Sequence, residues 1–220
     1  AHSASLNHIH AANLWNKLGK QRIERRHEGR LEQLVQRTLD LVASCEARNL
    51  ANIAHGVAKC GLQVGVVRSL YTAVAEAAVR GGLAGFNPQN LSNTVWAYAT
   101  AGVTADKLFA AVEEAAVRSE LADFDPQALS TTVWAYATAG VAAETLYAAV
   151  AEAAVRGGLA GFNPQDMSNT VWAYATAGVA AETLYAAVAE AAVRRGGLAG
   201  FNAQELSNTV WAYAAAHLEH

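Results

Sequence analysis

The sequence predicts an all-α protein, a right-handed α-solenoid of stacked antiparallel helix pairs with about 11 helices. The first observation is a motif that recurs at steps of 38, 38 and 39 residues, marked by Trp96, Trp134, Trp172 and Trp211. A regular period of this size is typical of stacked supersecondary units. The second is composition: 3 prolines in 220 residues leave room for long helices, and the apolar 53%, rich in alanine, suits close helix packing.

Each regular 38-residue repeat is predicted to contain two helices. Asn87 is a typical N-cap, Pro88 suits the first helical position, and Gly102 suits the helix end, so a first helix is expected over about residues 88–101. The amphipathic pattern that follows predicts a second helix over about residues 105–118. Paired glycines end most of these second helices. The Leu and Phe of the short link behind them are expected to fill the seam between units.

The first 80 residues contain the same pattern in weaker form. A first helix closed by Gly61 is expected around Asn49–Asn52, with His55 at the tryptophan position, and its partner over residues 66–80. Ser5–Leu18 and Glu28–Ser44 form a further predicted pair. In all, six repeats are expected to contain a first helix and five of them a second helix. The last repeat therefore has a first helix without a partner.

The predicted organisation has three parts. Residues 1–81 are degenerate N-terminal repeats, residues 82–216 are regular 38-residue repeats, and residues 217–220 resemble the start of a histidine tag. On that interpretation the natural chain is expected to continue past residue 216. Residues 1–80 hold eleven Lys and Arg against six Asp and Glu, whereas residues 81–220 hold five against thirteen. The net charges are therefore +5 and −8, and an RNA or DNA partner is expected to favour the first part.

Several function classes find no support in the sequence. Cys45 and Cys60 have no metal or redox spacing and are expected to be reduced, partly buried thiols. No uncharged apolar run reaches the length of a membrane span. Phosphate-binding loops, metal clusters and nucleophile motifs are absent, so the protein is expected not to be an enzyme and to need no cofactor or metal.

A helical projection of the first helix separates a core arc from a polar strip. The strip is expected to hold Asn90, Asn93, Thr94 and Thr100 around a central Ala97, on the concave surface where first helices usually lie. Trp96 and its copies could stack on bases, but their place on the core arc favours packing. The Asn93 position either reads base edges or ties neighbouring first helices together, and both interpretations stay open. The variation between Asn90 and its counterparts either serves helix capping, which could explain it alone, or reflects the reading of different ligands.

Charged residues give weaker signals. Glu and Arg recur four residues apart near the ends of the second helices, a spacing typical of exposed ion pairs. The densest basic cluster indicates a phosphate contact. It comprises Lys17, Lys20, Arg22, Arg25, Arg26 and Arg30.

The motif Gln89-Asn90-Leu91-Ser92-Asn93-Thr94-Val95-Trp96-Ala97-Tyr98-Ala99, with its 38-residue period, resembles the octotricopeptide repeat family. The resemblance is close in four units and loose in the two before them, and the proline-rich entry to the second helix is missing. It implies sequence-selective binding of single-stranded RNA in mitochondria or chloroplasts, for maturation, stability or translation of organelle transcripts. One base per repeat would be contacted by side chains of the first helix. The alternative is a protein–protein interaction scaffold, since the regular repeats are acidic.

The resemblance and the basic cluster together nominate a set of RNA-binding residues. They are Asn52, Asn90, Asn93, Thr94, Thr100, Ala128, Thr131, Asp166, Asn169, Glu205, Asn208, Lys17, Lys20, Arg22, Arg25 and Arg26. Single-stranded RNA is the expected partner, other proteins are a second class of partner, and no membrane partner is expected.

Overall fold

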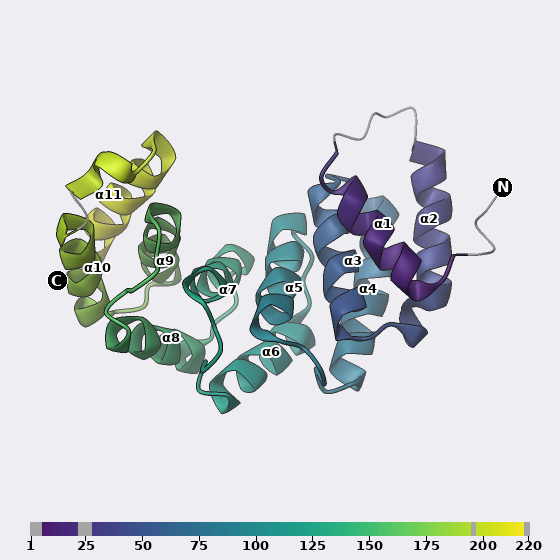
Figure 1. Cartoon of the computed structure of the whole chain (residues 1–220), viewed down its shortest axis with the longest axis horizontal. Coiled ribbons are helices and arrows are strands. Elements are labelled where there is room, and N and C mark those ends of the chain that lie inside the picture. Colours follow the sequence, from purple (N-terminus) through teal and green to yellow (C-terminus); the bar gives the residue numbers. More distant parts are fainter. Residues whose placement is uncertain (1–5, 22–27, 195–196, 218–220) are drawn as a thin grey trace. The chain divides into compact units, whose positions relative to one another are not determined.

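The computed structural model describes residues 6–21, 28–194 and 197–217 (Figure 1). This part of the chain is all-α, with eleven α-helices, two short 3₁₀ helices and no strand. The predicted all-α class is therefore confirmed. The α-helices are α1 (His8–Leu18), α2 (Glu28–Leu41), α3 (Ala47–Lys59), α4 (Val64–Arg80), α5 (Pro88–Ala101), α6 (Asp106–Arg118), α7 (Pro126–Ala139), α8 (Glu144–Arg156), α9 (Pro164–Ala177), α10 (Glu182–Arg194) and α11 (Ala203–His217).

The chain forms two compact units, Ala1–Val112 (unit 1) and Glu113–His220 (unit 2), which divide within α6. In unit 1 the first helices of the repeats pack in sequence order, α1 against α3 and α3 against α5, while α2 packs against α4. In unit 2, α7, α9 and α11 make the corresponding row, and α8 packs against α10. Each unit is thus a stack of helix pairs, as expected of an α-solenoid. The predicted division after residue 81 stays a prediction based on sequence regularity.

The helix boundaries follow from local chemistry. The side chain of Asn87 accepts a hydrogen bond from the Asn90 amide, Pro88 opens α5, and Gly102 ends it in the left-handed conformation at φ 63°. A residue without Cβ adopts that conformation at no steric cost. The helices α7 and α9 begin and end in the same way. Expected and observed bounds of α5 agree, but α1 begins at His8 rather than Ser5, because Asn7 is its N-cap.

Neighbouring first helices approach closely at one small residue. A Cβ on Gly56 of α3 would lie 2.5 Å from the backbone carbonyl group of Trp15 in α1. Alanine takes the matching place in the later first helices, and those side chains are fully buried. They are Ala97, Ala135, Ala173 and Ala212. The helices of a row therefore touch through residues with little or no side chain.

A recurring tyrosine pair holds the two rows together. The hydroxyl of Tyr98 in α5 donates to the backbone carbonyl of Tyr71 in α4 at 2.6 Å, and the two rings pack edge to face at 4.9 Å. In unit 2, Tyr174 makes the same bond to Tyr147, also at 2.6 Å, with rings 5.0 Å apart. Burial raises the pKa of all four hydroxyls well above the usual value. These residues are neutral donors that satisfy carbonyls inside the fold.

The links between repeats contain the Leu and Phe expected to fill the seams. Leu159 and Phe162 are 0% and 3% exposed, so this expectation is confirmed there. Leu159 adopts a positive φ of 55°, a conformation that costs a non-glycine residue about 1–2 kcal/mol. Burial of the leucine side chain offsets that cost by a similar amount.

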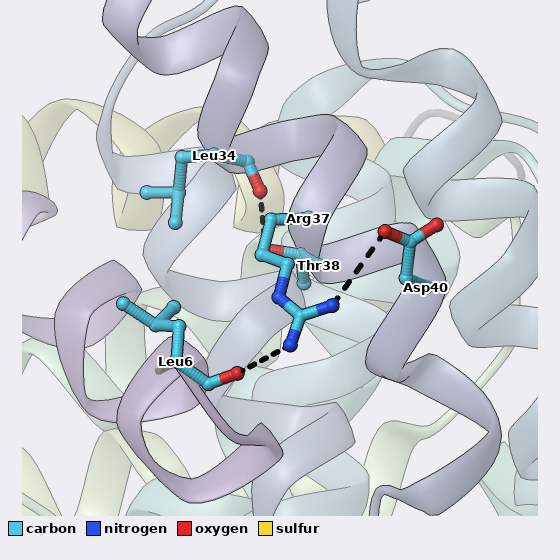
Figure 2. Close-up of polar contacts among 5 residues, drawn as sticks. All are labelled: Leu6, Leu34, Arg37, Thr38 and Asp40. Carbon is cyan, nitrogen blue, oxygen red and sulfur yellow. Dashed lines mark hydrogen bonds and ion pairs between the residues drawn. The ribbon is translucent and has the colours of Figure 1, made fainter. Parts of the chain in front are cut away.

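The first helix pair is fastened by polar contacts (Figure 2). Arg37 of α2 donates from Nη2 to the Leu6 carbonyl at 2.9 Å and lies 3.8 Å from the Asp40 carboxylate. Behind it, the Thr38 hydroxyl donates to the Leu34 carbonyl at 2.6 Å and accepts the indole N–H of Trp15 at 2.9 Å. The irregular first repeat therefore has a buried Trp15–Thr38 hydrogen bond and more exposed Arg37 contacts in place of the tyrosine pair.

Candidate functional site

One narrow face of each first helix stays open to solvent. In α5 it consists of Gln89, Asn93, Trp96 and Thr100, which are four, three and four residues apart and share one side of the helix. We call this face the open stripe. Aligning the N-caps and the small crossing residues gives the stripe in the other first helices. It comprises Ile9, Asn13 and Asn16 in α1, with Lys20 just after that helix; Arg48, Asn52, His55 and Lys59 in α3; Gln127, Thr131, Trp134 and Thr138 in α7; Gln165, Asn169, Trp172 and Thr176 in α9; and Gln204, Asn208, Trp211 and Ala215 in α11.

The expected polar strip is only partly right: Asn93 and Thr100 lie on the open stripe, but its other members do not. Ala97 and Thr94 are 0% exposed and Asn90 is 8% exposed, so three of its members are buried. The Thr94 hydroxyl donates to the Asn90 carbonyl within the same helix. The error has a physical reason: α5 packs against α3 of its own row and is also bonded to the second helix α4, so more than one face is covered. This leaves a stripe rotated by roughly 80° from the expected one.

The expected core position of the tryptophans is also wrong. Trp96, Trp134 and Trp172 are half-buried, and Trp211 is 48% exposed. They stand in the open stripe, one turn after Asn93, Thr131, Asn169 and Asn208 respectively, all of which are half-buried as well. Thr100 is exposed as expected, and Asn52 is half-buried. The sequence did contain the signal, since the i, i+4, i+7, i+11 pattern of Gln, Asn, Trp and Thr is more polar than either flank.

Capping explains the variable position of the first turn. The Asp166 carboxylate accepts a hydrogen bond from the backbone N–H of Asn163 at 3.0 Å. The Glu205 carboxylate accepts one from the backbone N–H of Asn202 at 2.8 Å. Asn90 makes a longer contact of the same kind with Asn87, at 3.4 Å. Ala128, the fourth residue at this position, is 4% exposed. Asn90, Asp166 and Glu205 therefore cap their helices as expected, whereas Ala128 has no capping side chain; Glu205 is half-buried and the other three are buried.

In unit 2, serine hydroxyls bond neighbouring first helices to each other. The Ser130 hydroxyl of α7 donates to the Asp166 carboxylate of α9 at 3.0 Å. The Ser168 hydroxyl of α9 donates to the Glu205 carbonyl of α11 at 3.1 Å. Asn208 accepts a bond from Gln204 of its own helix at 2.8 Å. The asparagine amides of the open stripe therefore remain candidates for contact with a partner.

The open stripe of unit 1 contains positively charged side chains. Lys20, Arg48 and Lys59 are all exposed on it, and the last two were not among the predicted residues. Burial, and then the charges of Lys59 and Lys20, lower the pKa of His55 to about 4. His55 is therefore neutral at pH 7, and its ring packs on Trp96 at a centroid distance of 5.1 Å. The open stripe of unit 1 combines cations with aromatic rings, the two features through which proteins bind single-stranded nucleic acids.

Part of the predicted basic cluster can be placed. Lys17 and Lys20 lie in or just after the last turn of α1, and both they and Arg30 are exposed. Arg22, Arg25 and Arg26 lie outside the described residues. The Glu–Arg pairs of the second helices are confirmed as exposed ion pairs, with Arg118 to Glu114 at 2.5 Å and Arg156 to Glu152 at 2.6 Å.

Unit 2 has a different stripe, which carries no charged residue. The indoles of Trp134 and Trp172 lie side by side on α7 and α9, with ring centroids 6.4 Å apart and planes tilted by 32°. Trp211 continues the series on α11. Aromatic rings of this kind offer sequence-tolerant stacking surfaces for bases.

Other kinds of site find little support in the part of the chain that the structure describes. No group of three His, Cys, Asp or Glu residues is arranged to hold a metal ion there. Burial raises the pKa of both Cys45 and Cys60 to about 11, which makes them poor nucleophiles at neutral pH. Among the described helices, none has the length and apolar content needed to cross a bilayer.

The chain was compared with known proteins. No curated protein matches it. A family model described as RESC6, RNA-editing substrate-binding complex 6 protein, matches residues 2–220. This is not the octotricopeptide family that the repeat motif resembles, although both descriptions concern RNA. Because the match covers nearly the whole chain, the protein belongs to the RNA-editing substrate-binding complex 6 family.

Proposed function

We propose that this protein binds single-stranded RNA through the open stripes of its first helices, as a non-catalytic subunit of an RNA-editing complex. The family description supplies the link to RNA and to a complex. The observation that carries the proposal is the composition of the stripes: exposed cations in unit 1, tryptophans in both units, and amide or hydroxyl side chains one turn before them.

These residue types match the needs of an unpaired strand. Single-strand binding proteins combine cations that follow the phosphates with aromatic rings on which bases stack. Lys20, Arg48 and Lys59 provide the first, and Trp134, Trp172 and Trp211 provide the second. Amides such as Asn169 add hydrogen bonds to base edges that a duplex would hide. Duplex RNA is a poor fit, because its deep major groove hides base edges from side chains.

The setting of this activity is part of the proposal. Editing complexes that act on organelle transcripts would place the protein in a mitochondrion or a chloroplast. The strand would then be a transcript whose maturation, stability or translation depends on being held unpaired. The protein's role would be to present that strand, with chemistry supplied by other subunits.

A titration of single-stranded RNA tests the proposal directly. A labelled pool of random 12-nucleotide RNA is titrated with the full chain at 50 mM and 200 mM salt, with a duplex of the same length as control. We expect binding to the single strand that weakens as salt rises, because cations release counterions on contact. Absence of binding at 50 mM salt would refute the RNA-binding function.

A second candidate function is a protein-interaction scaffold. Val193 and Val210 are 74% and 63% exposed, and the stripe of unit 2 has no cation. These features suit a protein partner, and a subunit of a complex needs such contacts. Capture of the chain's partners with and without ribonuclease distinguishes the two functions. Partners that survive ribonuclease while the RNA titration fails would favour the scaffold.

A further inference from the structure

The paired indoles of Trp134 and Trp172 lie on the open stripe, half-buried and outside the fully buried core. The same position of the stripe is occupied by Asn16 in α1 and by His55 in α3, and those helices pack in the same row. Packing between the rows is carried by the buried tyrosines instead, such as Tyr174. An indole on the open face therefore needs an explanation other than the core.

The separation of the two indoles is close to that of a stacked sandwich. Their centroids are 6.4 Å apart. Stacked bases lie about 3.4 Å apart along a strand, so a base placed between two rings needs a separation of about 6.8 Å. The planes are tilted by 32°, so the indoles must rotate before their faces become parallel around a base; we call this tilted pair the wedge. Of the two ring pairs in this series, the His55–Trp96 pair of unit 1 is closer, at 5.1 Å, and tilted by 48°.

Polar side chains stand beside the wedge. Thr131 and Asn169 lie three residues before Trp134 and Trp172, hence one turn away on the same face of α7 and α9. Both are half-buried and uncharged. A carboxamide presents a donor and an acceptor side by side, which matches the N6 amino group and N7 of adenine. A threonine hydroxyl has no such paired geometry and accepts several bases.

We propose that one unpaired RNA base, preferably adenine, inserts between the indoles of Trp134 and Trp172, and that the Asn169 carboxamide reads its edge. This inference rests on the RNA-binding function proposed above and adds a defined subsite in unit 2. No ion pair with phosphate is involved, because the stripe of α7 and α9 has no cation. Thr131 contributes a contact without selectivity.

Stacking is tested with a fluorescent base. A U9 RNA with one central 2-aminopurine is titrated with the full chain, because stacking against an indole quenches this base. Wild type is expected to quench it, whereas Trp134→Leu and Trp172→Leu lose the quenching and weaken binding about tenfold. Leucine keeps an apolar side chain for packing and removes the ring. Glu152→Gln on α8, which affects only an exposed ion pair, is the matched control and should bind as wild type.

Base reading is tested by a reciprocal exchange. The ratio of affinities for A9 and U9 is expected to fall about tenfold in Asn169→Thr and to rise in Thr131→Asn, which gives the wedge a second carboxamide. Both exchanged residues are half-buried and polar, and urea unfolding of each variant checks that the fold is kept.

The outcomes separate the two proposals. If wild type binds none of these RNAs at 50 mM salt, the RNA-binding function itself fails. If wild type binds but both leucine variants quench and bind equally well, the wedge is not a base site and this inference is overturned. An adenine preference that Asn169→Thr leaves unchanged overturns the role of Asn169. Where a leucine variant unfolds, Trp172→Phe replaces it, and retained binding with partial quenching supports stacking, whereas unchanged quenching contradicts the wedge.

Discussion

Units 1 and 2 share a way of packing but differ in the chemistry they present. Both align their first helices in a row through small crossing residues, Gly56 in one and Ala173 in the other. Both join that row to the second helices by a tyrosine hydroxyl bonded to a backbone carbonyl at 2.6 Å. On the open stripe, however, unit 1 has Lys20, Arg48 and Lys59, whereas unit 2 has neither lysine nor arginine.

This difference shows that packing within the fold and contact with a partner depend on different residues of a first helix. Buried positions fix the fold, and their residue types hardly change between units. The open stripe is less buried and varies more, with cations in unit 1 and tryptophans in both units. If RNA is the partner, unit 1 provides salt-dependent attraction and unit 2 provides stacking.

The largest effect is expected from removing the cations of unit 1. Changing Lys20, Arg48 and Lys59 together to Gln should lower RNA affinity roughly a hundredfold at 0.1 M salt and reduce the salt slope by about 2, at about 0.7 per phosphate contact. Trp172→Leu should weaken binding with the slope unchanged. Filter binding over a salt series measures both. Equal slopes for the two variants would break the contrast between the units.

A close-contact substitution tests the shared packing. Gly56→Ala places a Cβ 2.5 Å from the Trp15 backbone and is expected to lower the free energy of unfolding by about 2 kcal/mol. Gly65→Ala in α4 is the matched control, since a Cβ there meets no atom within 4 Å. The control should gain up to about 1 kcal/mol from helix propensity. Urea unfolding measures both, and a stable Gly56→Ala would mean that the row tolerates wider spacing.

The tyrosine bonds should matter equally in the two units. Tyr98→Phe and Tyr174→Phe each remove a hydroxyl and leave a buried carbonyl without its donor, at a cost of about 1–1.5 kcal/mol. The two losses should agree within about 0.5 kcal/mol, because the geometries are the same. Urea titration followed by circular dichroism tests this. A large loss in one unit alone would show that the packing is less alike than the contacts indicate.

The smallest effect is a pH dependence confined to unit 1. The pKa of His55 is about 4 in the folded chain, below its usual 6.5, so folding favours the neutral ring. Its contribution to stability is complete above pH 6.5 and is lost as pH falls from 6.5 towards 4. The ring is partly exposed, so the loss is expected to stay near 1 kcal/mol. His55→Phe should remove this dependence, measured as unfolding midpoints at pH 7 and pH 4.5. An unchanged pH profile would assign the dependence to other groups.

Local signals predicted most of the fold. Asn87, Pro88 and Gly102 determine α5 almost to the residue, because capping and left-handed glycine depend on neighbours within one turn. The same holds for the counterparts in α7 and α9. In the first repeat, the sequence predicted a helix that begins at Ser5. The structure shows that Asn7 is the N-cap and that α1 begins at His8.

The candidate site was harder to predict. Which face of a first helix stays open depends on how many neighbours it has, and helix periodicity alone does not count them. Ala97 looked like the centre of an exposed strip because it is small and lies among polar residues, yet its smallness serves the helix crossing. Trp96 looked like core because it is large and apolar. Both errors come from tertiary packing that overrides single-helix patterns.

The carboxylate of Asp166 makes two kinds of hydrogen bond. It caps the N-terminus of its own helix, α9, and it accepts a hydrogen bond from the Ser130 hydroxyl of α7. The repeat that begins with α9 is therefore not a self-contained cassette, because its capping carboxylate also bonds a serine of the preceding copy. Anyone lengthening or reordering such an array by recombination would need to move the serine and the acidic cap as a matched pair across the junction. The 38-residue period marks how the sequence repeats, whereas the interchangeable piece straddles two periods.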